Sequence, residues 1–203
     1  MFDPVGSTSW HNRHLASFRH LNELLRAENT ADITVMVVGP GGVTRLASLL
    51  LNDAAAEGAS VIRRLIGDGA RYGDQLFRRV PGVPLRSLEP LELTGALTVP
   101  HKLVVADRSQ RVLAAVSRDL PDTICHCVDI SFQPIPQKAE VVVAFNVVCR
   151  LEEKAPDGMS RVVEAVLPNG WLLIDDRSAR AHLGLYPEFV QVAPKTYRRR
   201  EAP

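Results

Sequence analysis

The sequence has few cysteines, almost no net charge and no long apolar run. Three cysteines in 203 residues are too few, and odd in number, for a disulfide framework, which favours a reducing compartment. A formal net charge of +1 gives the chain no overall field that would attract nucleic acid or a membrane surface. No apolar run approaches the roughly 20 residues of a membrane span, and the first residues lack a signal pattern. We therefore expect a soluble cytoplasmic protein with neither a membrane nor a nucleic-acid partner.

Metal and phosphate-loop motifs are missing as well. Cys125-His126-Cys127 has one residue between its cysteines and no second pair, whereas zinc sites place two or more residues between paired ligands. We therefore expect no metal, and we expect Cys125 and Cys127 to be buried thiols on one face of a strand. A Gly-Lys-Ser/Thr phosphate loop is absent. The three arginines at 198–200 fit a solvated tail better than a nucleic-acid patch.

Apolar patterning predicts that strands and helices alternate along the chain. Strands are expected at 33–38, 103–106, 124–128, 141–144 and 171–174, and a hairpin over 188–197. Helices are expected at 8–28, 109–118 and 159–166. This order predicts an α/β fold: a doubly wound, Rossmann-like sheet of seven mainly parallel strands with a C-terminal antiparallel hairpin.

The stretch at about 53–98 interrupts this alternation. We expect residues 1–30 to form an N-terminal helical cap and residues 31–203 one α/β domain that contains the interruption as a helical insertion. Two short apolar patterns, at 61–66 and 72–77, predict two short helices, and the prolines that follow predict a loop at residues 81–90. The insertion is expected to pack as a helical cap. It could close over the active site, form a homodimer face or shape an acceptor pocket.

Glycines and polar side chains stand where successive predicted strands end. The first strand ends in the Gly39-Pro40-Gly41-Gly42 turn, whose glycines let a ligand approach the backbone. The next two strands end in Asp107, a possible acceptor for ribose hydroxyls, and in Asp129, placed to accept from an exocyclic amine. The fourth ends in Phe145-Asn146, where an aromatic ring can stack and an amide can bond. Because ligands bind beyond the carboxyl ends of such strands, these residues predict one nucleoside site.

These segments resemble the motifs of the class I S-adenosylmethionine-dependent methyltransferases. Residues 35–42 (VMVVGPGG) are similar to the glycine turn under the methionine part of the cofactor, and 104–109 (VVADRS) to the motif whose acid holds the ribose. Residues 127–130 (CVDI) are similar to the motif whose acid meets the adenine amine, and 142–148 (VVAFNVV) resemble the fourth motif. Residues 166–174 (VLPNGWLLI) resemble the turn into the fifth strand.

The resemblance implies S-adenosylmethionine as cofactor and methyl transfer as the reaction. The cofactor-binding residues that it implies are Gly39, Pro40, Gly41, Asp107, Arg108, Asp129, Ile130, Phe145 and Asn146. N-terminal helices commonly cover the pocket in this family, so the candidates for binding the methyl acceptor are Trp10, His14, Phe18 and, from the insertion, Tyr72. The alternative for the N-terminal face is that it packs on the sheet. The fourth motif lacks the Asn/Asp-Pro-Pro-Tyr/Phe pattern of base-amine methyltransferases, which favours a small-molecule acceptor.

Two departures from the family pattern keep other functions open. Val37 stands where the family usually has an acid, and Val43 where it usually has a third glycine. These departures motivate an alternative, a catalytically inactive cofactor-binding or partner subunit. Gly39, Gly41 and Thr44 also come close to the G-x-G-x-x-G pattern, which leaves a nicotinamide-dependent oxidoreductase as a third hypothesis.

Overall fold

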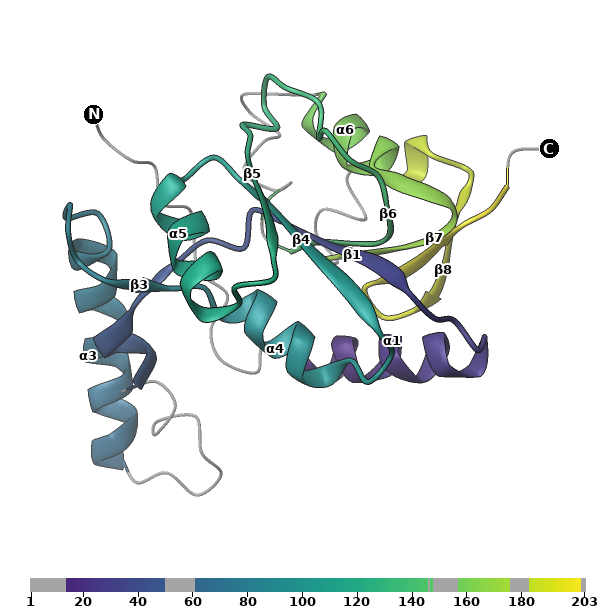
Figure 1. Ribbon diagram of the computed structural model, residues 1–203. Coiled ribbons are helices and arrows are strands. Elements are labelled where there is room, and N and C mark those ends of the chain that lie inside the picture. Colours follow the sequence, from purple (N-terminus) through teal and green to yellow (C-terminus); the bar gives the residue numbers. More distant parts are fainter. Residues whose placement is uncertain (1–13, 50–60, 146, 148–156, 176–182, 202–203) are drawn as a thin grey trace.

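The computed structural model describes residues 14–49, 61–145, 147, 157–175 and 183–201 (Figure 1). The helices are α1 (Leu15–Ala27), α3 (Val61–Phe77), α4 (Leu88–Ala96), α5 (Gln110–Asp119), α6 (Gly158–Glu164) and the 3-10 helix η2 (Leu183–Leu185). The strands are β1 (Ile33–Val38), β2 (Val43–Thr44), β3 (Leu85–Arg86), β4 (His101–Asp107), β5 (Ile124–Cys127), β6 (Ala139–Ala144), β7 (Val166–Ile174), β8 (Phe189–Ala193) and β9 (Thr196–Arg199).

Seven of the strands form one sheet in the order β5-β4-β1-β6-β7-β9-β8. The first five pair in parallel, and β9 pairs antiparallel with both β7 and β8. From β1 the chain builds outward through β4 and β5, then returns to place β6 on the other side of β1. This reversal makes β1 the topological switch point, beside which ligands bind in such sheets. The predicted mainly parallel sheet with a C-terminal antiparallel hairpin is confirmed.

The sheet is covered on both faces because its central strands carry long apolar runs whose side chains point to both sides. In β1, Val35 and Val37 point into one buried cluster, and Met36 and Val38 point into the other. The first cluster includes apolar residues of α1, α4 and α5, and the second includes those of α6. Figure 1 shows α6 on the opposite side of the sheet from α1 and α4. Continuous burial of this kind is typical of parallel strands between two helical layers.

The insertion differs from its prediction in two places. One continuous helix, α3, replaces the two short helices expected at 61–66 and 72–77. Residues expected as loop form β3 and α4, and Pro90 lies in the first turn of α4. Proline is tolerated there because the first N–H groups of a helix have no partner inside it. Helix α4 packs beside α1 in the core under the sheet, so this part of the insertion is not a cap.

The turn predicted before the fifth strand lies inside β7 instead. Strand β7 already begins at Val166, and its register against β6 shifts between Ala139 and Val141. Asn169 has a left-handed φ of 57°, which bends the strand at this bulge. A Cβ at Gly170 would lie 2.7 Å from the Leu167 carbonyl oxygen, so only glycine fits the bend. The helix expected at 159–166 accordingly ends earlier, at Glu164.

Strand β5 lies at the edge of the sheet, and its thiols are less buried than expected. Cys127 is exposed and Cys125 is half-buried, so the prediction of two buried thiols is wrong. An edge strand has a neighbour on one side only, which leaves its residues open to solvent. Cys149 lies outside the described residues. Within the described chain, no three His, Cys, Asp or Glu side chains gather as a metal site would require, and none of the described helices has the length and apolar content of a transmembrane span.

Candidate functional site

The turn after β1 has a backbone that suits glycine. Gly39 and Gly41 have φ of +59° and +66°, in the left-handed region that other residues rarely adopt. The Gly39 N–H donates to the Ala106 carbonyl over 2.7 Å, which ties the turn to the end of β4. A Cβ at Gly39 would lie 2.6 Å from a methyl carbon of Val147. The turn therefore brings bare backbone to the carboxyl edge of the sheet, between β4 and the residues that follow β6.

Asp107 ends β4, and its buried carboxylate faces this turn. One oxygen, Oδ1, accepts from the Ser109 N–H at 2.7 Å, and Oδ2 accepts from the Gly41 N–H at 3.4 Å. Asp107 is not itself the N-cap of α5, because the Ser109 hydroxyl accepts from the N–H of Val112. An ionised carboxylate accepts hydrogen bonds on both oxygens, which is the chemistry that the hydroxyls of a ligand require. Asp107 thus places a buried carboxylate in a fixed position beside the glycine turn.

Asp129 follows β5 and is held beside Asp107 along the same edge. Its Oδ1 accepts from the Ser131 N–H at 3.0 Å, and its Oδ2 lies 3.8 Å from a guanidinium nitrogen of Arg108. The Val128 N–H donates to the Asp107 carbonyl over 3.1 Å, which connects the two strand ends directly. Ile130 is buried, and its carbonyl accepts from Arg161. The structure therefore brings together the glycine turn and both acids predicted from the sequence.

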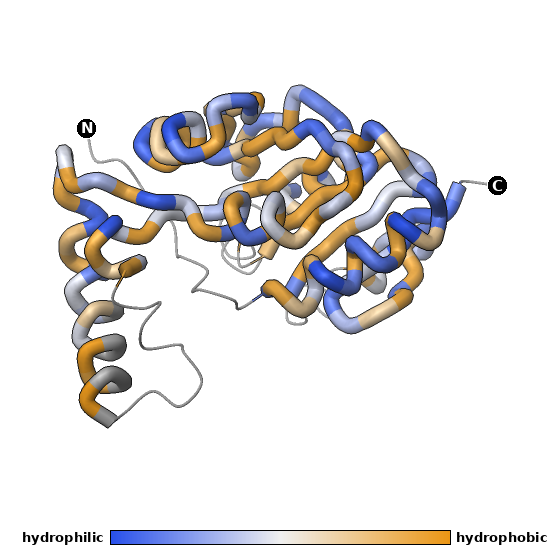
Figure 2. The backbone as a smooth tube through the Cα atoms, turned by 60° about the horizontal axis from the view of Figure 1, so that its bottom comes forward, coloured by the Kyte–Doolittle hydropathy of each residue, from blue (hydrophilic) through white to orange (hydrophobic). Residues whose placement is uncertain are grey.

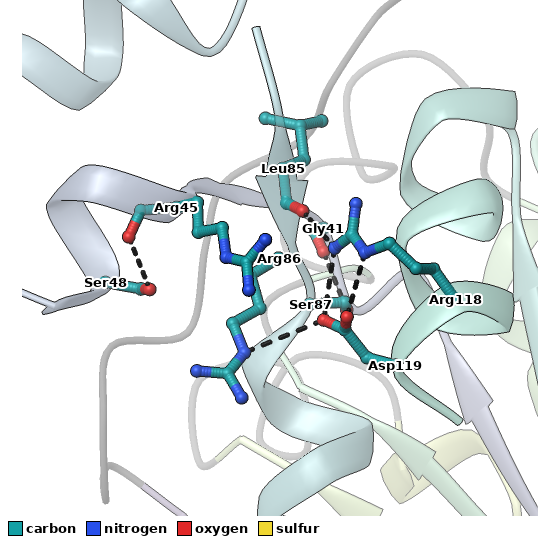
Figure 3. A network of polar contacts seen from close by, with 8 residues as sticks. All are labelled: Gly41, Arg45, Ser48, Leu85, Arg86, Ser87, Arg118 and Asp119. Atoms are coloured by element: carbon teal, nitrogen blue, oxygen red, sulfur yellow. Dashed lines mark hydrogen bonds and ion pairs between the residues drawn. The ribbon is translucent and has the colours of Figure 1, made fainter.

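The insertion holds the glycine turn from the other side, through a residue that the sequence analysis missed. The Ser87 hydroxyl donates to the Gly41 carbonyl over 2.9 Å, although the two residues are 46 positions apart. Figure 3 shows Ser87 reaching Gly41 beside the residues that fix β3 against α5. Arg118 donates to the Leu85 carbonyl, and Arg86 pairs with Asp119 at 3.6 Å. The hydrogen bond that Arg118 donates to the Asp119 carboxylate raises the pKa of Arg118.

A buried carboxylate of α3 makes a second connection to the turn. The Thr44 N–H, two residues beyond Gly42, donates to Asp74 Oδ1 over 2.6 Å. Asp74 Oδ2 lies 3.9 Å from Nε of Arg78. Burial raises the pKa of Asp74 above its ordinary value, and the hydrogen bonds from Thr44 oppose this rise. No local pattern marks Asp74 or Ser87 as site residues, because their partners are far away along the chain.

The aromatic residues expected on the ligand and acceptor sides pack on one another. Phe145 stacks on His14 with ring centroids 3.8 Å apart and an interplanar angle of 8°, and Phe18 lies against the same pair. All three are buried. Phe145 faces this way because it continues the alternation of Val141 and Val143, which point toward α1. In this structure the ring that was expected to stack on a ligand stacks on His14, at the start of the N-terminal helix.

The remaining predicted site residues differ in burial and in location. Pro40 is buried within the glycine turn, and Arg108 is half-exposed beside Asp129. Tyr72 is 73% exposed on α3, outside the buried aromatic group of His14, Phe18 and Phe145. Trp10 and Asn146 lie outside the described residues.

Comparison with known proteins gives similarity of structure without similarity of sequence. The chain matches no protein-family model and no curated protein. A similar solved structure is the N-methyltransferase NodS from Bradyrhizobium japonicum WM9 in complex with S-adenosyl-L-homocysteine, with 12% identity over 94% of this chain and 90% of that chain and a TM-score of 0.47.

Two further similar structures come from longer proteins. One is the amino pentose methyltransferase CalS10 from Micromonospora echinaspora with bound S-adenosylmethionine, with 15% identity over 83% of this chain and 51% of that chain and a TM-score of 0.45. The other is DesVI from Streptomyces venezuelae, with 14% identity over 81% of this chain and 51% of that chain and a TM-score of 0.43. In both cases the matched region is about half of the other protein.

Proposed function

We propose that this protein binds S-adenosylmethionine beyond the carboxyl ends of β1, β4, β5 and β6 and transfers its methyl group to a small-molecule acceptor. The observation that supports this proposal is the Asp107 carboxylate, which is buried against the glycine turn and is held there by the N–H groups of Gly41 and Ser109. It stands on the strand next to the topological switch point, where a nucleoside is expected in an open α/β sheet.

The residues at this edge fit the parts of the cofactor in order along the sheet. Asp107 would accept from the two ribose hydroxyls, because an ionised carboxylate has two acceptor oxygens and this one is fixed at the strand end by Gly41 and Ser109. Asp129 would accept from the adenine amine, with Ile130 as an apolar neighbour and Arg108 fixing the carboxylate. The backbone of Gly39, Pro40 and Gly41 would lie under the methionine part, where a side chain at Gly39 would collide with Val147.

The protein's part in the reaction is to position two reactants and exclude water. When bound, S-adenosylmethionine supplies a methyl group already activated by a positive sulfur, so the acceptor needs a general base only if it holds a proton near neutral pH. His14 and Phe18 are proposed to support the acceptor side from behind, because both are buried, and Trp10 is the third residue proposed there. His14 is buried on Phe145 directly after β6, which fixes its ring at the edge where the cofactor is proposed to bind. We assign no catalytic base.

Two observations make a nicotinamide-dependent oxidoreductase the weaker hypothesis. Thr44 stands at the third position of the G-x-G-x-x-G pattern, and its N–H is used by Asp74 of the insertion. The usual dinucleotide-binding sheet has six parallel strands in the order 3-2-1-4-5-6, whereas here the antiparallel β9 separates β7 from β8. An inactive cofactor-binding subunit would have the same site, and it would differ from the methyltransferase only in that it transfers no methyl group.

The proposal is tested by measuring S-adenosylhomocysteine affinity calorimetrically for the wild type and for Asp107→Ala. Because hydrogen bonds to a charged group contribute about 1.5–3 kcal/mol, we expect binding to weaken roughly 10- to 100-fold. Asp122→Ala, an exposed carboxylate in the turn before β5, is the matched control and should bind normally. Asp129→Ala is a second test in case Asp107→Ala fails to fold, because Asp129 is partly exposed and its replacement should disturb the fold less. We expect it to weaken binding by a smaller factor than Asp107→Ala.

The outcomes distinguish the three hypotheses. Unchanged affinity in both Asp107→Ala and Asp129→Ala would contradict the proposed site, and stabilisation of the wild type by NADH alone would contradict the proposed cofactor. Transfer of a labelled methyl group from S-adenosylmethionine to a component of a small-metabolite extract is expected for the enzyme. Tight binding with no transfer to any extract would replace the methyltransferase by the inactive subunit.

A further inference from the structure

Helix α3 turns its polar side toward the protein and its apolar side toward solvent. Asp74 and Arg78 are buried on the inward side, where Asp74 bonds to β2. The outward side carries large apolar side chains that are 47–73% exposed: Ile62, Leu65, Ile66, Tyr72, Leu76 and Phe77. Figure 2 shows this helix standing out from the sheet with apolar residues along its length. A contiguous exposed apolar surface of this kind marks an interaction site.

The spacing on the outward side is that of a helix that pairs with another helix. Ile62, Leu65, Gly69, Tyr72 and Leu76 follow one another at alternating intervals of three and four residues, the pattern of a coiled-coil seam. Gly69, at the middle of the seam, has no atom within 4 Å of the position that a Cβ would take. A glycine within a helix is unfavourable relative to alanine, and nothing in the described chain packs against Gly69. Close approach of a second backbone would give this glycine a structural reason.

We propose that this seam is the contact surface for a second copy of the chain, with two α3 helices packed antiparallel about a two-fold axis near Gly69. An apolar stripe is complementary to itself, so a closed symmetric pair needs no other partner. In the antiparallel arrangement Ile62 of one copy meets Leu76 of the other, and Gly69 meets Gly69. This inference does not depend on the proposed function.

The amount of apolar surface suits a dimer. Leu46 and Leu49, also more than half exposed, lie on the neighbouring helical residues 45–49, which pack on α3 through Ala47 and Ala70. Eight exposed apolar side chains, at on the order of 100 Å² each, would supply the ~800 Å² per partner that a stable interface buries. The residues of the seam would then lie at the centre of the interface. The other exposed apolar residues and the polar residues of α3 would lie around them.

The charge of the region separates a second copy from an anionic partner such as a lipid surface. Residues 61–80, which are α3 and the three residues after it, contain five arginines and two aspartates, so two copies of this segment repel each other through their charges. Added salt screens this repulsion and should leave the dimer unchanged or make it tighter. An anionic partner would be held partly by the arginines, and its binding would weaken as salt is added.

Sedimentation equilibrium of the intact chain over a wide concentration range, at low and high salt, tests the proposal. We expect a reversible dimer that Leu65→Glu weakens at least roughly tenfold, because the substitution places a charge in the centre of an apolar interface. Leu185→Glu is the matched control: Leu185 is 76% exposed on η2, away from α3, and its replacement should leave the dimer intact. The melting temperature of Leu65→Glu, measured at low concentration, should equal that of the wild type.

A cross-link tests the geometry directly. In a background with all three cysteines replaced by serine, Gly69→Cys should form an intermolecular disulfide on oxidation, and Gly95→Cys should not. A wild type that stays monomeric at every concentration would overturn the proposal. So would a dimer that Leu65→Glu leaves intact. Binding of the monomer to vesicles containing anionic phospholipid, lost at high salt and in Leu65→Glu, would assign the surface to a membrane instead.

Discussion

Helices α1 and α3 are both amphipathic, and the protein uses them in opposite ways. The apolar side of α1 is completely buried, with Phe18, Leu21 and Leu25 at 0% exposure under the sheet. The apolar side of α3 faces solvent, with Leu65 at 65% and Leu76 at 72% exposure. Their periodicities alone do not distinguish them. The difference lies in what covers each helix, because the sheet and α4 cover α1, whereas α3 is attached through a buried carboxylate.

The comparison separates two uses of an apolar stripe. Burial of the α1 stripe stabilises the folded chain, since apolar area is removed from water when the chain folds. The α3 stripe gains nothing from folding, so its apolar residues contribute free energy only when another surface covers them. A substitution in α1 should therefore change folding, and the same substitution in α3 should change association.

Leucine-to-alanine substitutions in the two helices give the largest expected contrast. Leu21→Ala should lower the free energy of unfolding by about 2–5 kcal/mol, because it removes a fully buried side chain and leaves a cavity. Leu65→Ala should change it by less than about 0.5 kcal/mol in the monomer, because the side chain is already in water. Urea unfolding at low protein concentration measures both.

If Leu21→Ala and Leu65→Ala lowered the free energy of unfolding by similar amounts, the prediction would be wrong, and the apolar side of α3 would be covered by its own chain in solution. Leu185→Ala is the matched control, because it removes an exposed leucine of the same size outside both helices, and it should resemble Leu65→Ala. A change such as Ala96→Gly would not serve, because it alters helix propensity as well as packing.

The sheet and the acids of the candidate site could be predicted from the sequence because their signals are local. Continuous apolar runs give the strands, and Asp107 and Asp129 follow such runs directly. Parallel strands then bring these acids to one edge without further information. The contacts of Ser87 with Gly41 and of Asp74 with Thr44 could not be predicted, because they join residues 46 and 30 positions apart.

Tertiary context decides features that local sequence does not indicate. The place of Phe145 after a strand predicts a ligand contact, and in the structure its side chain follows the alternation of β6 toward α1 and stacks on His14. Cys127 was expected to be buried, but β5 turned out to be an edge strand. The order of the strands decides which strand lies at the edge of the sheet and which elements pack on each of its faces. That order is set by contacts between segments that are distant in the sequence.

Gly69→Ala sharpens the comparison at a smaller scale. In a Leu65→Glu background, which keeps the chain monomeric, the change should raise the free energy of unfolding by about 0.5–1 kcal/mol if α3 unfolds with the rest of the chain, since alanine favours a helix and its methyl group meets no atom. In the wild-type background the same change should weaken the dimer. Gly170→Ala is the opposite case, because its methyl group would meet the Leu167 carbonyl, and it should be destabilising.

The smallest expected effect concerns the polar attachment of α3, which should depend on pH. The pKa of Asp74 is raised by burial above its ordinary value of 3.8, with the hydrogen bonds from Thr44 and the charge of Arg78 opposing the rise. Between the unfolded and the folded pKa the folded chain holds more protons than the unfolded chain. The contribution of Asp74 to the free energy of unfolding is therefore full below pH 3.8 and falls as pH rises through the folded pKa.

Asp74→Asn should remove this decline, because the amide oxygen can still accept from the Thr44 N–H while no charge has to be buried. The measurement is urea unfolding of both proteins over a pH series that starts below 3.8 and extends to neutrality. As pH rises, the free energy of unfolding of the wild type should fall relative to that of Asp74→Asn. Asp122→Asn, at an exposed position, should show no such pH-dependent difference from the wild type. A constant difference across the series would mean that Asp74 has the same pKa in the folded and unfolded chains and would contradict this prediction.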